Sequence, residues 1–446
     1  MCSWKNKTKF RQIARQTYKL ELYNQGVTMK YNKELITFKN GLRLVFVPTP
    51  DMYTARIRIT FSVGSEDEKD EYGMAHLLEH EFFKGTSKYN QKERSEQFSR
   101  LAAEPNASTS AEFTTFKARF PLPAFKKVVE LFSDMIFDSV FDEKELESEK
   151  NVVIEEIKMH EDRPSHLVFD ELIAGRFKGS GLGNRIAGRE ELLRSITREQ
   201  LIEFKNKHYN AKNCIICVVG DYKKKEVIEE IDKHFISLFD KTATGKEVVK
   251  VHAPYIKPKN EVIKVKKDIQ QANIIVAFSS PSLAHIDRSK LYLMSYILGG
   301  TMNSRLFDKI RNQLSLCYGI YSTILNFANN GVFLIDFSTT NENSMKAINE
   351  VFAIIEDIKK NGVTDQEFEE AKYMTVSQIK MDNDYPSTSG INYLEYTGEI
   401  RDKEKLAETF AGFTKAECEE AFRKYITKDS LTVAFVGDTS KFNFKI

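Results

Sequence analysis

Hydrophobic residues recur with two different periods along the chain, which predicts both strands and helices. The segments ITFKNGLRLVFVPTP and TARIRITFSVGS have the alternation of strands, the first around an Asn-Gly turn. In the second half, NEVIKVKKD and QANIIVAFSSP have the same character. Helical spacing instead relates the apolar residues of PAFKKVVELFSDMIFD, which are Phe125, Val128, Val129, Phe132, Met135 and Ile136. This mixture predicts an α+β fold whose mainly antiparallel sheets are covered by helices on one face.

One pattern occurs twice. The segments ITREQLIEFKNKHYNAKNCIICVVGD (residues 196–221) and FTKAECEEAFRKYITKDSLTVAFVGD (residues 413–438) align without a gap. Each predicts an amphipathic helix capped by a threonine, Thr197 or Thr414, then a polar turn and an apolar strand ending in Val-Gly-Asp. The repeat indicates two related halves that arose by duplication.

A linker is predicted between these halves. Residues 241–262 are rich in Lys and small polar residues, include prolines and lack helical periodicity. We therefore divide the chain into an N-terminal extension (1–34), a first domain (35–240), the linker (241–262) and a second domain (263–446).

Composition narrows the classes of protein. The chain has 446 residues and a formal net charge of +2, which gives no electrostatic reason to expect nucleic acid as a partner. No run of apolar residues is long enough for a membrane span or a secretory signal. The five cysteines are sparse and odd in number, which is typical of a reducing compartment. Cys214 and Cys217 form a C-x-x-C pair, but in an apolar strand they are expected to be buried on opposite faces.

The first 28 residues are basic and contain a single acid, Glu21. Such a segment is typical of a poorly ordered extension, and equally of an organelle transit peptide. We favour the extension and a cytoplasmic location. The matrix of a mitochondrion or related organelle is the alternative.

The stretch GMAHLLEHEFFKGT carries the most specific chemistry. On a helix, His76, Glu79 and His80 share one face, because they are separated by three and four residues. Two imidazoles one turn apart reach a single metal ion, and the glutamate between them reaches a water on that ion. A chance occurrence of this spacing is not negligible, so a third ligand is needed.

The segment ELESEKNVVIEEIKMHED supplies a candidate. It predicts a helix with Asp142 as N-cap, on which Glu149 and Glu156 share a half-buried face with Val152 and Val153. Buried carboxylates need a cationic partner. The alternative is a solvated, acidic helix face.

These residues resemble the pitrilysin family, which includes insulin-degrading enzyme, mitochondrial processing peptidase and short bacterial members. The H-x-x-E-H order is the inverted zinc motif of that family. PNASTSAEFTTFKARF resembles its substrate-binding strand, with Phe116 where a Tyr is common. GGTMNSRLFDKIRNQLSLCYGIYS resembles its substrate-contacting segment in the second half. The chain departs from the pattern at Glu81, where an apolar residue is common, and at Leu314 and Ser315, where many relatives have Arg-Gly.

The resemblance implies a site that holds one Zn²⁺ per chain. Its metal ligands are His76, His80 and Glu156, its general base is Glu79, its accessory carboxylate is Glu149, and its substrate-binding residues are Asn106, Ala107, Ser108, Thr109, Arg311 and Tyr318. The alternation from Asn106 to Thr115 also predicts a strand, whose edge is expected to pair with substrate backbone.

The implied activity is zinc-dependent hydrolysis of peptide bonds in short or unfolded polypeptides, with Glu79 accepting a proton from the attacking water. The family encloses a chamber with four related domains, so this chain is expected to form a homodimer that places Arg311 and Tyr318 against the partner's zinc. Alternatives are a heterodimer with an inactive paralogue, a catalytic subunit of an organelle presequence-processing peptidase, and a non-catalytic scaffold subunit.

Overall fold

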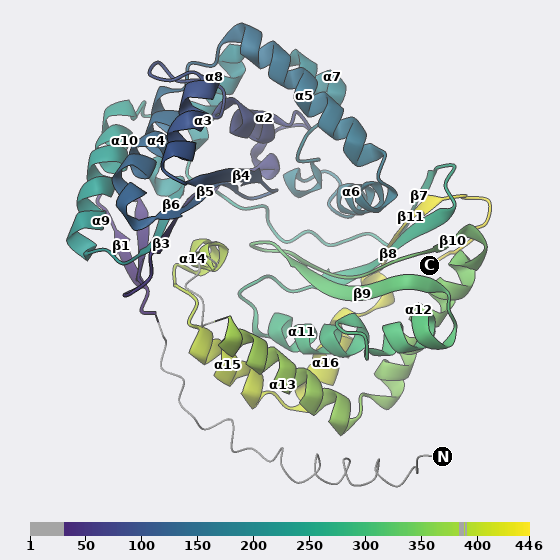
Figure 1. Cartoon of the computed structure of the whole chain (residues 1–446). Coiled ribbons are helices and arrows are strands. Elements are labelled where there is room, and N and C mark those ends of the chain that lie inside the picture. Colours follow the sequence, from purple (N-terminus) through teal and green to yellow (C-terminus); the bar gives the residue numbers. More distant parts are fainter. Residues whose placement is uncertain (1–30, 383–387, 389) are drawn as a thin grey trace, which may run out of the picture.

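A computed structural model describes residues 31–382, 388 and 390–446 of the chain (Figure 1). The basic segment 1–28 lies outside the described residues. Two sheets form the framework, one in each half of the chain. Within the described part of the chain, no helix combines the length and the apolar character required to cross a membrane.

The first sheet has six strands in the order β1-β2-β6-β3-β5-β4. The pair β2·β6 is parallel and the other pairs are antiparallel. The strands are β1 (Glu34–Thr37), β2 (Arg43–Pro48), β3 (Thr54–Phe61), β4 (Glu104–Thr109), β5 (Thr114–Pro121) and β6 (Cys214–Gly220). An Asn-Gly turn joins β1 to β2 as predicted, with Gly41 at φ 95°. In contrast, β6 lies between β2 and β3, so these two consecutive strands are not neighbours.

The second sheet has five strands in the order β7-β11-β8-β10-β9. They are β7 (Glu261–Lys266), β8 (Gln271–Ser280), β9 (Cys317–Asn326), β10 (Gly331–Thr340) and β11 (Thr432–Gly437). The pair β7·β11 is parallel and the other pairs are antiparallel. This order corresponds strand by strand to β2-β6-β3-β5-β4, which extends the predicted repeat from two segments to both sheets.

Helices cover one face of each sheet, which confirms the predicted α+β class. In Figure 1 most helices of the second half lie below its sheet, away from the first half, and α14 (Ile391–Thr397) is the exception. The first half contains α2 (Met74–Glu81), α3 (Gln91–Arg100), α4 (Phe125–Asp138), α5 (Glu143–Glu161), α6 (Pro164–Arg176), α7 (Glu190–Ser195), α8 (Arg198–His208), α9 (Lys224–Ile231) and α10 (Ser237–Thr242). The second half contains α11 (Ile286–Gly299), α12 (Ser344–Asn361), α13 (Asp365–Met381), α14 (Ile391–Thr397), α15 (Lys403–Gly412) and α16 (Lys415–Tyr425).

The repeated segments fold alike. Thr197 caps α8 and Thr414 caps α16. Each threonine side chain accepts a hydrogen bond from the backbone N–H three residues later, and the side chain of that later residue accepts one from the threonine's backbone N–H. Each helix is followed by an interior strand of its half's sheet, β6 or β11. The predicted apolar face of α4 is buried from Phe125 to Ile136.

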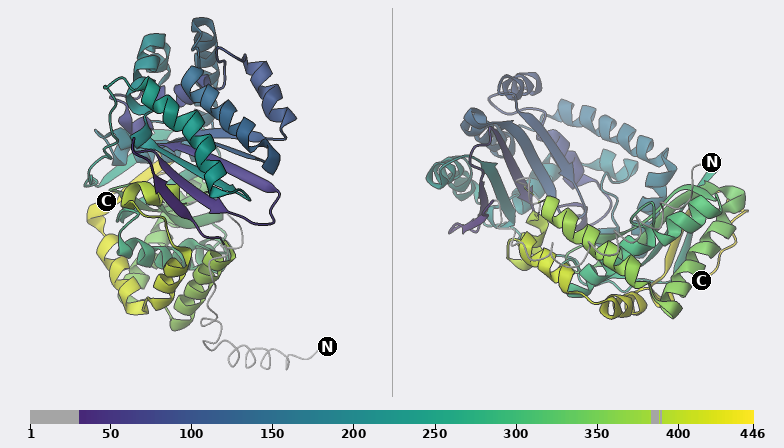
Figure 2. Two further views of the ribbon diagram at one scale, coloured as in Figure 1. Left: turned by 90° about the vertical axis from the view of Figure 1, so that its left-hand side faces the viewer. Right: turned by 60° about the horizontal axis from the view of Figure 1, so that its bottom comes forward.

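Each half also places one helix against the other half's sheet. Val168 and Leu172 of α6 pack on the inner face of the second sheet, against residues such as Ile275 and Val436. At its end, α6 carries the buried Arg176, which donates hydrogen bonds of 3.0 Å to Ser430 O and Thr432 Oγ1. The reciprocal helix is α14, which packs on the inner face of the first sheet. The two lobes are therefore joined through both inner faces (Figure 2).

Cys214 and Cys217 illustrate these two faces. Cys214 belongs to the core under the helices of the first half, and Cys217 belongs to the cluster that receives Ile391 and Leu394 of α14. Both thiols are free and buried, and burial raises the pKa of Cys217 to about 12. The prediction of two buried hydrophobes on opposite faces is confirmed.

Residues 243–260, between α10 and β7, form neither helix nor strand. They lie where the sequence predicts a linker. The domain bounds remain a prediction, since the exchange of α6 and α14 means that each half contributes to the other's core.

Candidate metal centre

Two contacts fix the N-terminus of α2. Its N-cap is Gly73 at φ 74°, where a Cβ atom would lie 2.3 Å from Ala187 O, so only glycine fits. The buried carboxylate of Glu68 accepts a hydrogen bond of 3.0 Å from Ala75 N, one of the free N–H groups of the first turn. Burial raises the pKa of Glu68 to about 7.

The apolar side of α2 is buried as its pattern predicts. Leu77, Leu78 and Phe82 are inaccessible to solvent. This burial fixes the rotation of α2 about its own axis. As a result, His76, Glu79 and His80 face a cavity of about 490 Å³. The cavity is also lined by the end of β4 and by residues of α5 and α6.

The third predicted ligand reaches the same point from α5, which is capped by Asp142 as predicted. Glu156 Oε2 lies 3.9 Å from His76 Nε2 and 3.7 Å from His80 Nε2. One donor atom from each of the three residues lies within 4.8 Å of the other two. The donors therefore converge without forming close hydrogen bonds to one another.

The predicted burial along α5 is partly wrong. Glu149 and Val153 are buried, but Val152 is 51% exposed. Residues 149, 152, 153 and 156 all follow the helical repeat, but Val152 lies at the margin of that face, where its side chain is exposed. The buried face of α5 is thus narrower than predicted.

Glu149 orients the second imidazole. Its Oε1 lies 2.8 Å from His80 Nδ1, and its Oε2 pairs with Lys84 Nζ. Burial alone would lower the pKa of His80, but the hydrogen bond and charge of Glu149 outweigh it and raise that pKa above its ordinary value. Burial alone would raise the pKa of Glu149, and its contacts with His80 and Lys84 lower it. With Nδ1 engaged, His80 presents Nε2 to the cavity.

His76 is in a drier environment. Burial lowers its pKa to about 3, so the ring is neutral at physiological pH. Within the described part of the chain, its buried Nδ1 has no hydrogen-bond partner, while its Nε2 faces Glu156. Neutral imidazole is the form of histidine that binds a metal.

Glu79 lies beside these donors and touches β4. Thr109 Oγ1 donates a hydrogen bond of 2.5 Å to Glu79 Oε2. Burial raises the pKa of Glu79, and the hydrogen bond from Thr109 opposes that rise. A partly buried carboxylate held by one hydroxyl is suited to accept a proton.

The donor set fits zinc. Two imidazole nitrogens and one carboxylate oxygen are the ligands of catalytic zinc sites, which keep a fourth position open. The unpaired, converging nitrogens of His76 and His80 leave room for an ion between them and Glu156. The contact between His80 and Glu149 is the outer hydrogen bond that metal-bound histidines make.

The predicted substrate strand reaches this cavity. Ala107, Ser108 and Thr109 line it, and β4 is the edge strand of its sheet. The prediction that the strand continues to Thr115 is wrong, because β4 ends at Thr109 and a turn at residues 110–113 leads into β5. Asn106 is on β4 but is not among the lining residues.

Arg311 and Tyr318 lie elsewhere. All residues that line the cavity belong to the range 76–188, so neither side chain from the second half is brought to it within one chain. The Arg311 guanidinium stacks on the rings of Phe307 and Tyr318, at 4.4 and 5.1 Å from their centroids. Tyr318 is 88% exposed on β9, the edge strand of the second sheet.

Sequence reasoning missed several residues around the site. Glu68 caps α2 from a loop, Lys84 pairs with Glu149, and His160 lines the cavity one turn after Glu156. The spacing of His160 from Glu156 was the one available signal. Nothing local in the sequence marks the contacts of Glu68 or Lys84.

The fold is two-lobed, and the first lobe carries the converging donor set. Residues 43–190 match the family described as Insulinase (Peptidase family M16), and residues 195–374 match the Peptidase M16 inactive domain. The chain belongs to peptidase family M16.

Similar proteins carry related names. The uncharacterized zinc protease YmxG of Bacillus subtilis is 33% identical over 339 residues, which cover 75% of this chain and 81% of the relative. An uncharacterized zinc protease of Rickettsia bellii is 29% identical over 93% of this chain and 100% of its own length. A probable mitochondrial-processing peptidase subunit beta of Arabidopsis thaliana is 31% identical over 264 residues, 59% of this chain and 50% of that protein.

Solved structures share the fold. The crystal structure of a protease from Helicobacter pylori superposes with a TM-score of 0.82 at 22% identity, covering 91% of this chain and 99% of that one. The peptidase M16 inactive domain from Pseudomonas fluorescens gives 0.83 at 19% identity, covering 91% and 98%.

Proposed function

We propose that the chain is a zinc-dependent endopeptidase that hydrolyses peptide bonds in short or unfolded polypeptides. The observation that carries the proposal is the convergence of His76, His80 and Glu156 beside Glu79, at the end of an edge strand. When bound, zinc supplies Lewis-acid chemistry, which polarises a peptide carbonyl and makes water more acidic.

The chain's own residues supply the remaining steps. The free edge of β4 pairs with an extended peptide through backbone hydrogen bonds, which demands little of the peptide's side chains. Thr109 orients Glu79, and Glu79 accepts the proton of the attacking water and delivers it to the leaving amine nitrogen. Glu149 holds the His80 ring in place.

The test compares metal content and cleavage of a quenched fluorescent peptide. Wild type is expected to hold about one zinc per chain and to cleave. Glu79→Gln is expected to keep zinc and to lose activity by about 10²-fold or more, because only the proton acceptor is removed. A fully active Glu79→Gln variant would exclude Glu79 as the base. Wild type that binds zinc but cuts nothing would favour the scaffold alternative.

A matched pair on α5 tests the third ligand. Glu156→Gln is expected to lose zinc, whereas Glu155→Gln is expected to retain zinc and activity, because Glu155 is exposed and forms its ion pair with Lys158. Equal zinc content in the two variants would remove Glu156 from the ligand set. Dialysis of wild type against a chelator, followed by added zinc, should abolish and then restore cleavage.

A second candidate is the removal of presequences, favoured by the 31% identity to the plant processing-peptidase relative. Two peptides with the same scissile sequence separate this from general peptide degradation, one preceded by a basic amphipathic leader and one by a neutral leader. At least tenfold preference for the basic leader would support processing. Equal rates would support general degradation.

A further inference from the structure

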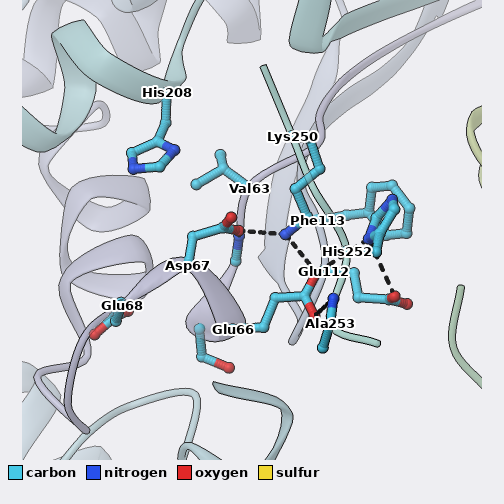
Figure 3. Close-up of polar contacts among 12 residues, drawn as sticks. Val63, Glu66, Asp67, Glu68, Glu112, Phe113, His208, Lys250, His252 and Ala253 are labelled. Atoms are coloured by element: carbon cyan, nitrogen blue, oxygen red, sulfur yellow. Dashed lines mark hydrogen bonds and ion pairs between the residues drawn. The ribbon is translucent and has the colours of Figure 1, made fainter. Parts of the chain in front are cut away.

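A buried ionic cluster lies where the first half, the linker and the second half meet (Figure 3). Lys250 Nζ lies 2.5 Å from Glu66 Oε1 and 2.5 Å from Asp67 Oδ2. His252 Nδ1 lies 3.0 Å from Glu66 Oε1 and 3.3 Å from Glu112 Oε1. The side chains of Glu66, Lys250 and Glu112 are 5% exposed or less.

The cluster is an ion-pair joint and not a second metal site. Glu66, Glu112 and His252 have ligand atoms close enough to share an ion. However, the ammonium of Lys250 already contacts Glu66. Burial alone would lower the pKa of His252, but Glu112 and Glu66 raise it to about 9, so the ring carries a positive charge at neutral pH. The two cations, Lys250 and His252, thus already pair with the three carboxylates of the cluster, Glu66, Asp67 and Glu112.

Glu112 also bonds directly to the second half. Its Oε1 accepts a hydrogen bond of 2.8 Å from Ala328 N, in the turn between β9 and β10. Its Oε2 accepts a hydrogen bond from the hydroxyl of Tyr396 on α14. One buried carboxylate therefore contacts the linker and two separate elements of the second half.

The turn that contains Glu112, at residues 110–113, lies next to the proposed active site. Thr109, which donates to Glu79, is three residues before Glu112. Ala111 O accepts a hydrogen bond of 2.9 Å from Glu66 N, in the short η3 helix (Ser65–Asp67) that leads to α2. A Cβ on Gly64 would lie 2.1 Å from Ser110 O, so this close contact requires glycine. The turn at residues 110–113 is therefore fixed on one side to η3, which leads to α2, and on the other side to the second half.

We infer that Glu112 is a positioning residue: it fastens the end of β4 to the second half, so that the place of Thr109 against Glu79 depends on the contact between the halves. The inference rests on the proposed function. According to this inference, the ionic joint holds the two lobes together and also fixes the position of the end of β4 at the proposed active site.

The experiment compares Glu112→Ala, Glu112→Gln and Tyr396→Phe with the full-length wild type. The matched control is Glu367→Gln, because Glu367 pairs with Arg305 at 2.6 Å entirely within the second half. Peptide cleavage should show kcat/KM reduced by about tenfold or more in Glu112→Ala, with zinc content unchanged, since a small displacement of a catalytic group has a large effect on rate. Glu112→Gln should recover part of the rate, Tyr396→Phe should lose less, and Glu367→Gln should match wild type.

Hydrogen exchange provides a readout that does not need activity. In Glu112→Ala and Tyr396→Phe, the amides of Glu104–Thr109 should exchange faster than in wild type and in Glu367→Gln. If wild type cuts no peptide but this exchange pattern is found, the proposed function is wrong, whereas the claim that Glu112 fastens β4 to the second half stands. Wild-type kcat/KM with wild-type exchange in Glu112→Ala overturns the inference. A loss of rate that only follows a loss of zinc or of folded protein also overturns it.

Discussion

Glu81 is a carboxylate in a buried position where an apolar residue would be expected. It follows the candidate ligand His80 directly, it is 1% exposed, and neither of its carboxylate oxygens has a hydrogen-bond partner among the residues that the structure describes. Burial and the nearby carboxylate of Glu149 raise the pKa of Glu81 to about 7. An apolar residue, which the resemblance leads one to expect here, would not incur this cost.

Replacing that carboxylate should stabilise the protein. We expect Glu81→Leu to raise the free energy of unfolding by about 1–3 kcal/mol, because a buried polar group without a partner is removed. Urea denaturation measures the change. Glu155→Leu is the exposed control and should stay within about 0.5 kcal/mol of wild type. A destabilised Glu81→Leu variant would show that the carboxylate has a favourable partner.

Ser315 is another position at which the chain departs from the pattern of the family it resembles. Its φ is +52°, in the left-handed region that glycine adopts most easily. The Gly that many relatives carry here suits this conformation directly. Ser315 adopts this conformation here, and its N–H donates a hydrogen bond of 3.1 Å to Arg311 O.

The ionic joint predicts a pH dependence of stability. The pKa of His252 is higher in the folded chain than its ordinary 6.5, so its contribution is complete below pH 6.5 and is lost as pH rises through about 9. Unfolding free energies of wild type should fall across this window by up to about 3 kcal/mol more than those of His252→Gln. Parallel curves for the two proteins would contradict the prediction.

At the scale of elements, the exchange of α6 and α14 is the feature that joins the halves. Leu172 and Val168 of α6 are fully buried against the second sheet, although α6 belongs in sequence to the first half. The apolar face of α6 marks it as buried, but its partner sheet begins almost a hundred residues later. Periodicity identifies which side of a helix is covered and contains no information about what covers it.

Truncating this face should weaken the joint. Leu172→Ala is expected to lower the free energy of unfolding by about 2–4 kcal/mol, because a buried side chain is replaced by a cavity between the halves. The exposed Val152 of α5 supplies the control, and Val152→Ala should change stability by less than about 0.5 kcal/mol. Chemical denaturation followed by circular dichroism measures both. A cost for Leu172→Ala no larger than that of the control would mean that α6 is not needed for the joint.

At the scale of the whole molecule, the separation of Arg311 and Tyr318 from the cavity bears on assembly. Tyr318 is exposed at a sheet edge, and the cavity is lined by the first half alone. We propose that these two side chains act on the site of a second copy of the chain, as the expected homodimer requires.

Mixing two inactive variants tests that arrangement. Glu79→Gln and Arg311→Ala are each expected to lose most activity. If Arg311 acts on the partner's site, an equimolar mixture should recover about a quarter of wild-type activity, because half of the dimers are mixed and each has one intact site. Analytical ultracentrifugation of the mixture measures whether dimers form. No recovery, with mixed dimers present, would show that Arg311 acts within its own chain or not at all.

Much of the site was predictable because its signals are local. Helical spacing groups His76, Glu79 and His80, the cap at Asp142 starts α5, and the two threonine caps mark the repeat. The turn at residues 110–113 was missed because both flanking strands alternate, which hid the break between them. Glu112 was missed because its partners, His252, Ala328 and Tyr396, lie far away in the sequence.

The sequence by itself determined the elements, the duplication and the residue types that bind a metal, since periodicity, capping and ligand spacing act over a few residues. Only the tertiary structure decided three further points: that Glu156 meets His76 and His80, that β6 and β11 insert between earlier strands, and that a carboxylate beside β4 bonds to the opposite half. Each of these depends on packing between segments distant in the chain. Such packing depends on the shape and burial of whole surfaces, which no local pattern specifies.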